Sequence, residues 1–467
     1  MLTGPGTAHF VGIGGIGVSA LARMLLRRGW QVTGSDLRAS EITDDLSRHG
    51  ARIHIGHGAA HVGNPDFVVY TAAARDDNPE LQAARRRGIP TIKRAELLGH
   101  LMAGKRGIAV AGTHGKTTTT ALIGLALVRA GLDPTVFIGG EAPELGGNYR
   151  EGSGDLLVAE ADEFDGSFLK LKPEIAVITN IEPEHLDFYG DFEHVKTAFH
   201  QFMEGATGPV VYCADDPVLQ EMLPDLRPEA PQHAVETREA CAVSYGIQQD
   251  AQWRAQDLRP NDAGGFDFLA SLNGAPFGSF SLRIPGRHNV SNALAAIAVV
   301  APQGVSPNCL QAALREFGGV KRRFQVLGTS DGVTVVDDYA HHPTEVRATL
   351  AAARARYPGR RIQCLFQPHT YSRTRTLMPL FADAFVDADK VWITEIYPAR
   401  EENLWDVTGE ELSRNIRHPA IAFVGDLHHA GEQVLPDLEP GDVLLLLGAG
   451  DIYHLGPVIL ASSADSE

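Results

Sequence analysis

Cysteine is scarce in this chain. Four cysteines occur among 467 residues and no two of them form a Cys-x-x-Cys pair; they are Cys213, Cys241, Cys309 and Cys364. This wide spacing argues against a thiolate zinc site, and the low number is typical of a protein from a reducing compartment.

Basic residues are also in short supply. Lysine and arginine together number 41 against 58 aspartates and glutamates, which gives a net charge of −17. Because nucleic-acid backbones bind to basic stripes, this balance argues against a nucleic-acid partner. It does not argue against ATP, whose charge is neutralised locally by Mg²⁺, a lysine and a helix N-terminus.

Long hydrophobic runs are absent as well. The densest apolar run, at 443–447, is far too short to cross a membrane, and the first ten residues lack the basic-then-apolar layout of a signal peptide. We therefore expect a cytoplasmic protein with no membrane partner.

The composition is that of a globular protein, with 44% hydrophobic and 21% charged residues. Three times the chain shows a strand that ends in a glycine-containing or polar turn and is followed by a helical pattern, which is typical of α/β domains with mainly parallel sheets. We predict a Rossmann-like domain at 1–104, a P-loop-type central domain at 105–324 and a second Rossmann-like domain at 325–467.

Individual elements follow from the apolar periodicity. Strands are predicted at 9–12, 31–36, 67–70 and 90–92, then at 108–111, 156–160, 175–180 and 209–213, and finally at 333–337, 361–366, 390–396, 420–424 and 442–447. Helices are predicted at 118–130, 288–300 and 343–357, a glycine-bearing break at 99–107 and a linker at 317–324. Residues 225–285 are interpreted as loops with a small antiparallel patch.

The most informative stretch is AGTHGKTTTT at 111–120. A strand, a glycine turn, Lys116-Thr117 and a helix form the layout of a phosphate-binding loop, in which backbone N–H groups face the anion. The lysine reaches the outer phosphates, and the threonine hydroxyl binds Mg²⁺. The eight-residue P-loop pattern is incomplete, because its first glycine would fall at Val110, so a glycine turn with a solvated lysine is the alternative.

A second glycine pattern lies near the N-terminus. Gly12, Gly14 and Gly17 form Gly-x-Gly-x-x-Gly, and Asp36 follows 19 residues after Gly17 at the end of a strand. This matches the dinucleotide fingerprint, so an NAD-linked oxidoreductase is a rival interpretation. The separate loop at Lys116 favours two diphosphate ligands in two domains, one of them ATP.

Acidic residues gather at the end of the predicted strand at 156–160 and directly after it. The residues are Glu160, Asp162, Glu163 and Asp165, while His185 follows the strand at 175–180. Because parallel strands end at the same sheet edge, a carboxylate and an imidazole there could bind Mg²⁺ beside Thr117. The alternative for His185 is a solvated side chain.

Eight ordered segments carry a family resemblance over essentially the whole chain. They are HFVGIGGIGVSALA, GTHGKTTTT, EADEFDGSF, TNIEPEHLDFYGD, GRHNVSNALAA, KRRFQ, DDYAHHPTEV and QPHTYSRT. On these motifs the chain resembles the Mur ligases of peptidoglycan synthesis. That family has three α/β domains, for a UDP-sugar, ATP and the incoming amino acid.

The resemblance implies roles for particular residues. The UDP-sugar diphosphate would lie on Gly14, Gly15, Ile16 and Gly17, with Asp36 in the same site. ATP would be bound by Gly112, Thr113, His114, Gly115, Lys116, Thr117, Thr118, His288, Asn292, Arg323 and Asp338. The metal ligands would be Thr117 for one Mg²⁺ and Glu160 with His185 for the other. Lys116, His341 and Arg373 would be catalytic, with His341 and Arg373 in the amino-acid pocket; the alternative for His341 and His342 is that they cap the helix at 343.

The implied reaction is the ATP-dependent joining of L-alanine to the lactyl carboxylate of UDP-N-acetylmuramate through an acyl phosphate. The alternative within the family is a recycling enzyme that attaches a tripeptide to the same nucleotide sugar. Two departures bear on the site: Phe164 stands where many relatives have serine, and Thr370 where some have arginine. We expect a monomer or a weak homodimer.

Overall fold

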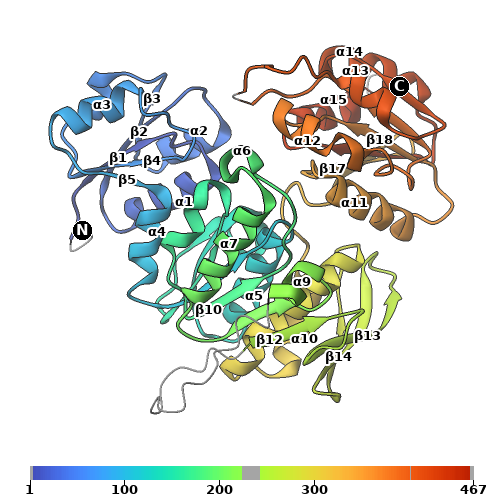
Figure 1. The fold of residues 1–467 in the computed structure, drawn as a ribbon, viewed down its shortest axis with the longest axis horizontal. Helices are drawn as coiled ribbons and strands as arrows, with labels where there is room; N and C mark the ends of the chain where they lie inside the picture. The colour runs from blue at the N-terminus through green and yellow to red at the C-terminus, as the bar shows by residue number, and fades with distance from the viewer. Residues whose placement is uncertain (1–3, 223–241, 400, 463–467) are drawn as a thin grey trace. The chain divides into compact units, whose positions relative to one another are not determined.

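The computed structural model describes residues 4–222, 242–399 and 401–462 (Figure 1). The chain divides into two compact units. The first holds the described residues of 1–254, 272–275 and 292–313, and the second holds those of 255–271, 276–291 and 314–467. Within the described ranges, no helix has the length and apolar character that a membrane crossing requires.

The N-terminal sheet is parallel throughout, with strand order β3-β2-β1-β4-β5. Its strands are β1 (Thr7–Val11), β2 (Gln31–Asp36), β3 (Arg52–Ile55), β4 (Phe67–Tyr70) and β5 (Thr91–Lys93), and its helices are α1 (Ile16–Arg27), α2 (Glu41–Arg48), η1 (Ala59–Val62), α3 (Pro79–Arg86) and α4 (Arg94–Met102). The strand order reverses at β1, and in open parallel sheets ligands bind at the carboxyl end of that point. The glycine turn after β1 lies there.

The central sheet has the order β15-β14-β13-β12-β11-β10-β6-β9-β7-β8. Its strands are β6 (Arg106–Ala111), β7 (Thr135–Ala142), β8 (Gly147–Arg150), β9 (Leu156–Glu160), β10 (Ile175–Ile178), β11 (Val210–Cys213), β12 (Ala242–Gly246), β13 (Trp253–Pro260), β14 (Phe266–Leu272) and β15 (Ala275–Ser281). β6 pairs in parallel with β9 and β10, so the loops after these three strands meet at one edge.

Helices of the central region follow its strands. They are α5 (Lys116–Arg129), η2 (Pro143–Leu145), η3 (Phe164–Lys170), α6 (Leu186–Tyr189), α7 (Phe192–Glu204), α8 (Pro217–Met222), α9 (Arg287–Val300), η5 (Ala301–Gln303) and α10 (Pro307–Glu316). α5 is buried along most of its length, from Thr117 to Leu127. The helix that opens at the phosphate loop is therefore a rigid part of the core.

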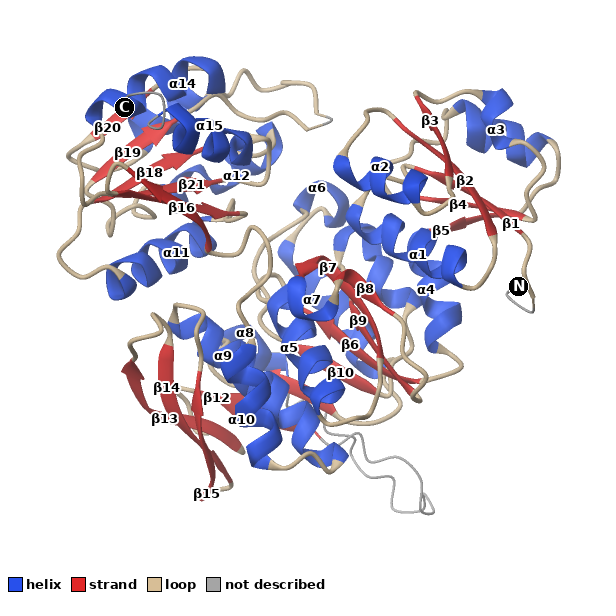
Figure 2. Ribbon diagram, turned by 180° about the vertical axis from the view of Figure 1, so that it is seen from behind, coloured by secondary structure: helices blue, strands red, loops and turns tan. Residues whose placement is uncertain are grey.

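The C-terminal sheet has the order β16-β17-β21-β18-β19-β20, with only β16 antiparallel to its neighbour. Its strands are β16 (Gln325–Ser330), β17 (Val333–Asp338), β18 (Ile362–Phe366), β19 (Lys390–Ile393), β20 (Ile421–Phe423) and β21 (Val443–Leu447), and its helices are α11 (Pro343–Arg356), α12 (Tyr371–Phe381), α13 (Gly409–Asn415), α14 (Leu427–Val434), η6 (Leu435–Asp437), η7 (Ile452–His454) and α15 (Leu455–Ser462). Helices cover both faces of this sheet (Figure 2), which explains why β21 is apolar and buried at every position.

The predicted fold class is confirmed. The predicted strands recur within a few residues of their observed bounds, and no helix or strand lies at 317–324, as the linker prediction requires. The boundaries of the three domains stay a prediction.

Two predictions about the fold need correction. The break predicted at 99–107 is shorter than expected and spans only 103–105, because α4 continues to Met102 and β6 begins at Arg106. Gly99 lies inside α4, where a Cβ would collide with the carbonyl oxygen of Lys170, so it permits close packing and not a turn. In the region at 225–285, where loops with a small antiparallel patch were predicted, the described residues from 242 form four strands, so the strand content is larger than expected; residues 225–241 lie outside the described part.

Candidate active site

The glycine turn after β6 is held in shape by the segment that follows β10. Thr113 N donates to the carbonyl of Asn180 at 3.0 Å, and His114 N donates to the Asn180 side chain at 2.8 Å. Glu182 N donates back to Thr113 Oγ1 at 2.8 Å. The strand at 175–180 ends early, at Ile178, because its last polar residues bind this turn.

Gly115 begins helix α5. It has a left-handed conformation with φ of 83°, which an L side chain would strain, and it is the N-cap of α5. The helix therefore starts at Lys116, two residues before the predicted start, and Lys116, Thr117 and Thr118 occupy its first turn. Backbone N–H groups of this turn have no partner within the helix, as an anion site requires.

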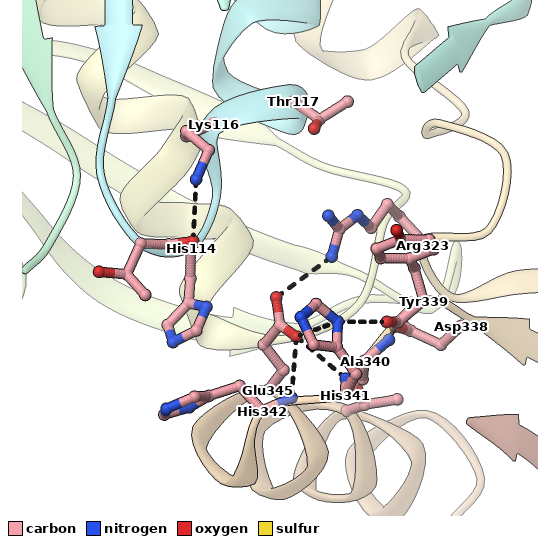
Figure 3. A network of polar contacts seen from close by, with 12 residues as sticks. His114, Lys116, Thr117, Arg323, Asp338, Tyr339, Ala340, His341, His342 and Glu345 are labelled. Atoms are coloured by element: carbon pink, nitrogen blue, oxygen red, sulfur yellow. Dashed lines mark hydrogen bonds and ion pairs between the residues drawn. The ribbon is translucent and has the colours of Figure 1, made fainter. Parts of the chain in front are cut away.

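Lys116 folds back over its own turn (Figure 3). Its Nζ donates to the carbonyls of Gly112 and Thr113 at 2.6 and 3.1 Å, and to Glu163 Oε1 at 2.9 Å. Burial lowers the pKa of Lys116, but the neighbouring carboxylates, Glu163 foremost, raise it by more. The side chain is thus a fixed ammonium group beside the phosphate-binding turn.

Glu163 is the residue whose role the sequence did not specify. It lies in the predicted acidic cluster, but nothing in the spacing indicates which carboxylate meets Lys116. Its side chain is 3% exposed. Burial raises its pKa to about 7, against the opposing effect of Lys116.

Two of the three predicted metal ligands lie in contact. Thr117 Oγ1 donates to Glu160 Oε1 at 3.1 Å, and the other oxygen of Glu160 accepts from Gly139 N at 2.8 Å. A hydroxyl beside a carboxylate at a phosphate loop fits the oxygen ligands that Mg²⁺ prefers. His185 has a φ of 57° and its ring meets that of Phe164 edge-on at 5.1 Å; its role as a ligand stays a prediction.

The predicted adenine-side residues both lie on α9. Asn292 is buried against the phosphate turn, where its side-chain oxygen occupies the space that a Cβ at Gly115 would take. His288 lies against Gly286 at the start of the helix. The structure therefore brings Asn292 to the phosphate turn within the first unit, and the role of His288 stays a prediction.

The N-terminal glycine turn opens onto helix α1. Gly12 N and Ile13 N donate to the carbonyl of Ser35 at 2.9 and 3.0 Å, and Gly14 N donates to Asp36 Oδ2 at 2.8 Å. Gly15 is the N-cap of α1, so Gly15, Ile16 and Gly17 stand at a helix N-terminus. Asp36 fixes the turn by this bond, and its predicted contact with the sugar nucleotide stays a prediction.

Asp338, predicted to reach the ATP ribose, is bound to the linker and to its own domain. Its two oxygens accept from Phe324 N and Ala340 N, each at 2.8 Å, and from Thr349 Oγ1 at 3.3 Å. Burial raises the pKa of Asp338 to about 6, although Arg323 opposes this. Asp338 thus ties the linker to the C-terminal sheet.

The start of α11 gathers polar side chains (Figure 3). Arg323 Nη1 lies 3.4 Å from Glu345 Oε1, and His341 lies 3.3 Å from the other oxygen of that carboxylate. His342 caps the helix, since its Nδ1 accepts from Thr344 N at 3.3 Å. The capping alternative is therefore correct for His342, while the ring of His341 points to the carbonyl of Tyr339 at 3.0 Å.

Arg373 and His341 belong to one group of side chains. Arg373 Nη1 lies 3.0 Å from His369 Nδ1, and the His369 ring lies 5.9 Å from that of His341 and stacks on Tyr397 at 5.6 Å. His369 and Tyr397 were not predicted, because only the fold brings the loop after β19 to the start of α12. Thr370, the N-cap of α12, has a φ of 65°.

Comparison with known proteins gives close relatives. The UDP-N-acetylmuramate–L-alanine ligase of Geobacter sulfurreducens is 47% identical over 459 residues, which cover 97% of this chain and 96% of the relative. The enzyme of the same name from Myxococcus xanthus is 45% identical and covers 97% of this chain and 94% of the relative.

A solved structure of UDP-N-acetylmuramate-alanine ligase from Thermotoga maritima has a TM-score of 0.84 at 31% identity, over 99% of this chain and 100% of that one. The murein peptide ligase from Psychrobacter arcticus shares the fold, with a TM-score of 0.75 at 24% identity over 99% of each chain.

Three family models match in order along the sequence. They describe the catalytic domain of the Mur ligase family at 7–106, the Mur ligase middle domain at 110–300 and the Mur ligase glutamate ligase domain at 322–450. The predicted resemblance is confirmed: this chain belongs to the Mur ligase family.

Proposed function

We propose that this chain is an ATP-dependent ligase that joins L-alanine to UDP-N-acetylmuramate in peptidoglycan synthesis. The observation that carries the proposal is the identity of 45–47% over nearly the full length to ligases of that name. The contacts of Lys116, Thr117 and Glu160 support it, because they form the kind of turn at which a phosphoryl group is transferred.

The first step makes the carboxylate reactive. An oxygen of the lactyl carboxylate attacks the γ-phosphorus of ATP, the bond from that phosphorus to the bridging oxygen breaks, and ADP leaves. Catalysis of such a step is mainly positioning and charge neutralisation. Lys116 supplies a fixed positive charge for the phosphates, and the first-turn N–H groups of α5 hold them. Mg²⁺, when bound by Thr117 and by Glu160 with His185, would supply the remaining neutralisation.

The second step forms the amide. The α-amino group of L-alanine attacks the acyl carbon, phosphate leaves, and one proton must pass from the nitrogen to a base. His341 is our candidate base, and Arg373 our candidate for holding the alanine carboxylate through a two-pronged contact.

The other site assignments are part of this proposal. ATP would also contact Gly112 to Thr118, His288, Asn292, Arg323 and Asp338, and the sugar nucleotide would contact Gly14 to Gly17 with Asp36. The cytoplasmic location and the monomeric or weakly dimeric state stay predictions.

One alternative within the family is attachment of a ready-made tripeptide to the same nucleotide sugar. The NAD-linked alternative is not retained, because the family models cover both glycine turns.

The deciding experiment measures phosphate release from MgATP and UDP-N-acetylmuramate, with L-alanine or the tripeptide L-alanyl-γ-D-glutamyl-meso-diaminopimelate added in parallel. We expect release that requires both the sugar nucleotide and L-alanine. Lys116→Ala should abolish release while leaving the Kd for the sugar nucleotide nearly unchanged. Preference for the tripeptide would assign the recycling reaction, and near-normal turnover by Lys116→Ala would refute the loop assignment.

A further inference from the structure

A buried amide from the central sheet binds the first turn of α1. Asn148 on β8 is 2% exposed, and its Nδ2 donates to the carbonyl of Ile16 at 2.5 Å and to Ser19 Oγ at 3.1 Å. Its Oδ1 accepts from Arg23 Nη1 at 2.5 Å. Because both ends of this buried amide are bonded, loss of either bond leaves a polar group unsatisfied.

The bonded carbonyl belongs to the glycine turn proposed to hold the UDP diphosphate. Ile16 is the first residue of α1, directly after the N-cap Gly15. Ser19, the other partner of Asn148, also donates its hydroxyl to the Ile16 carbonyl at 2.9 Å. The position of this turn is thus set partly by a residue outside its own domain.

The same hairpin also touches the ATP side. β8 pairs with β7, with Phe137 opposite Tyr149 and Ala142 opposite Gly147. On β7, Gly139 N donates to Glu160, whose carboxylate accepts from Thr117. A Cβ at Gly139 would collide with the Glu160 carboxylate, so the strand lies directly against it. Figure 2 shows β7 and β8 at the edge of the central sheet next to α1.

We propose that Asn148 is a positioning residue for the sugar-nucleotide site, and that the β7–β8 hairpin sets the diphosphate turn in register with the Thr117–Glu160 pair. The inference rests on the proposed function. Its physical reason is that the lactyl carboxylate must reach the γ-phosphate in line, and an error of about 1 Å in such an alignment costs about a hundredfold in rate.

The test compares Asn148→Ala and Asn148→Asp in the full-length protein. Both variants lose the N–H donor to Ile16, but the aspartate keeps an acceptor for Arg23. We expect both to raise the KM for UDP-N-acetylmuramate about tenfold and to lower kcat, with the KM for ATP changed less than about twofold. An aspartate variant with wild-type constants would overturn the proposal, because Asn148 would then act only through Arg23.

A matched control variant and a milder variant test whether the change in KM comes from the contacts of Asn148. Arg28, at the other end of α1, pairs with Glu151 next to β8 at 2.8 Å in a partly exposed ion pair, so Arg28→Ala should leave the KM for the sugar nucleotide unchanged. Ser19→Ala removes one partner of Asn148 and should shift that KM in the same direction by less. If either Asn148 variant lowers only the melting temperature, the role is structural and the proposal fails; if the wild type itself does not turn over the sugar nucleotide, the proposed function fails instead.

Discussion

At the scale of single residues, Arg373 is the side chain that we propose to hold the carboxylate of the amino acid. Its guanidinium is oriented by His369, with Nη1 3.0 Å from the ring nitrogen and 3.1 Å from the backbone carbonyl. A planar guanidinium can bind a carboxylate through two parallel N–H groups, whereas a lysine ammonium cannot. We therefore expect Arg373→Lys to raise the KM for L-alanine about tenfold, in steady-state phosphate release, with the KM for ATP unchanged.

A neighbouring arginine provides the control for this prediction. Arg375 lies two residues further along α12, where its guanidinium stands 5.4 Å from the centre of the Trp405 ring. Arg375→Lys should leave the KM for L-alanine as it is. Equal effects from the two substitutions would mean that Arg373 acts on the helix and not on the substrate.

Single residues were predictable from the sequence where a local motif specifies them. Lys116, Thr117 and Glu160 were predicted from a strand–turn–helix pattern and an acidic strand end, and Thr117 and Glu160 are in contact. Asn148 and Glu163 were not assigned roles, because no motif in the sequence specifies their partners, Ile16 and Lys116, and only the fold brings them together.

At the scale of secondary-structure elements, Glu80 joins four pieces of the N-terminal domain. Its side chain, on α3, is fully buried and accepts from His9 on β1 at 3.3 Å and from Ser35 on β2 at 2.5 Å. It also accepts from the N–H of Gly58, the N-cap of η1, and from His61 within η1, at 3.1 Å each. Burial raises the pKa of Glu80, but these hydrogen bonds lower it by more, to about 2 from 4.5.

The lowered pKa predicts how the stability of this domain depends on pH. A carboxyl whose pKa is lower in the folded state stabilises the protein above the unfolded pKa, here 4.5, and loses that contribution as the pH falls toward 2. Glu80→Gln should therefore lower the free energy of unfolding by about 3 kcal/mol at pH 7, and this difference from the wild type should fall to about half at pH 3.

Urea unfolding followed by Trp30 fluorescence measures this difference. Trp30 packs against Phe67 in the N-terminal domain, so a background with Trp253, Trp392 and Trp405 replaced by phenylalanine reports on this domain alone. Glu41→Gln, at an exposed position of α2, is the control and should unfold like the background. A difference that stays constant from pH 7 to pH 3 would contradict the assignment of an ionised Glu80.

Element boundaries were less predictable than element types, for reasons visible in single contacts. The strand predicted at 175–180 stops at Ile178 because the side chains of Thr179 and Asn180 bind the carbonyl of His114 in the phosphate turn. The strands β12–β15 were mostly missed, because their exposed faces give mixed polar runs without a clear period.

At the scale of the whole molecule, the repeated strand–turn–helix pattern was enough to predict three α/β sheets. It could not show where the chain bends. In the linker, Arg322 and Phe324 have positive φ angles of 60° and 49°. Phe324 N is bound to Asp338, and the carbonyl of Arg322 accepts from Tyr339 N at 2.7 Å. The linker is thus fixed to the C-terminal sheet from Arg322 onward, so we expect a pivot to lie before it, at 317–321.

This placement leads to the prediction for the whole chain. Activation must precede amine attack, and the ligands belong to different domains, so we expect the C-terminal domain to close over bound ATP. Small-angle scattering should show a smaller radius of gyration when a nonhydrolysable ATP analogue and Mg²⁺ are added. Lys116→Ala, which lacks the ammonium group proposed to hold the γ-phosphate, should respond less. Because Asp338 bonds the linker to its sheet, Asp338→Ala should have a larger radius of gyration than the wild type when no ligand is present. If the ATP analogue leaves the radius of gyration unchanged in the wild type, in Lys116→Ala and in Asp338→Ala, closure about this linker is excluded.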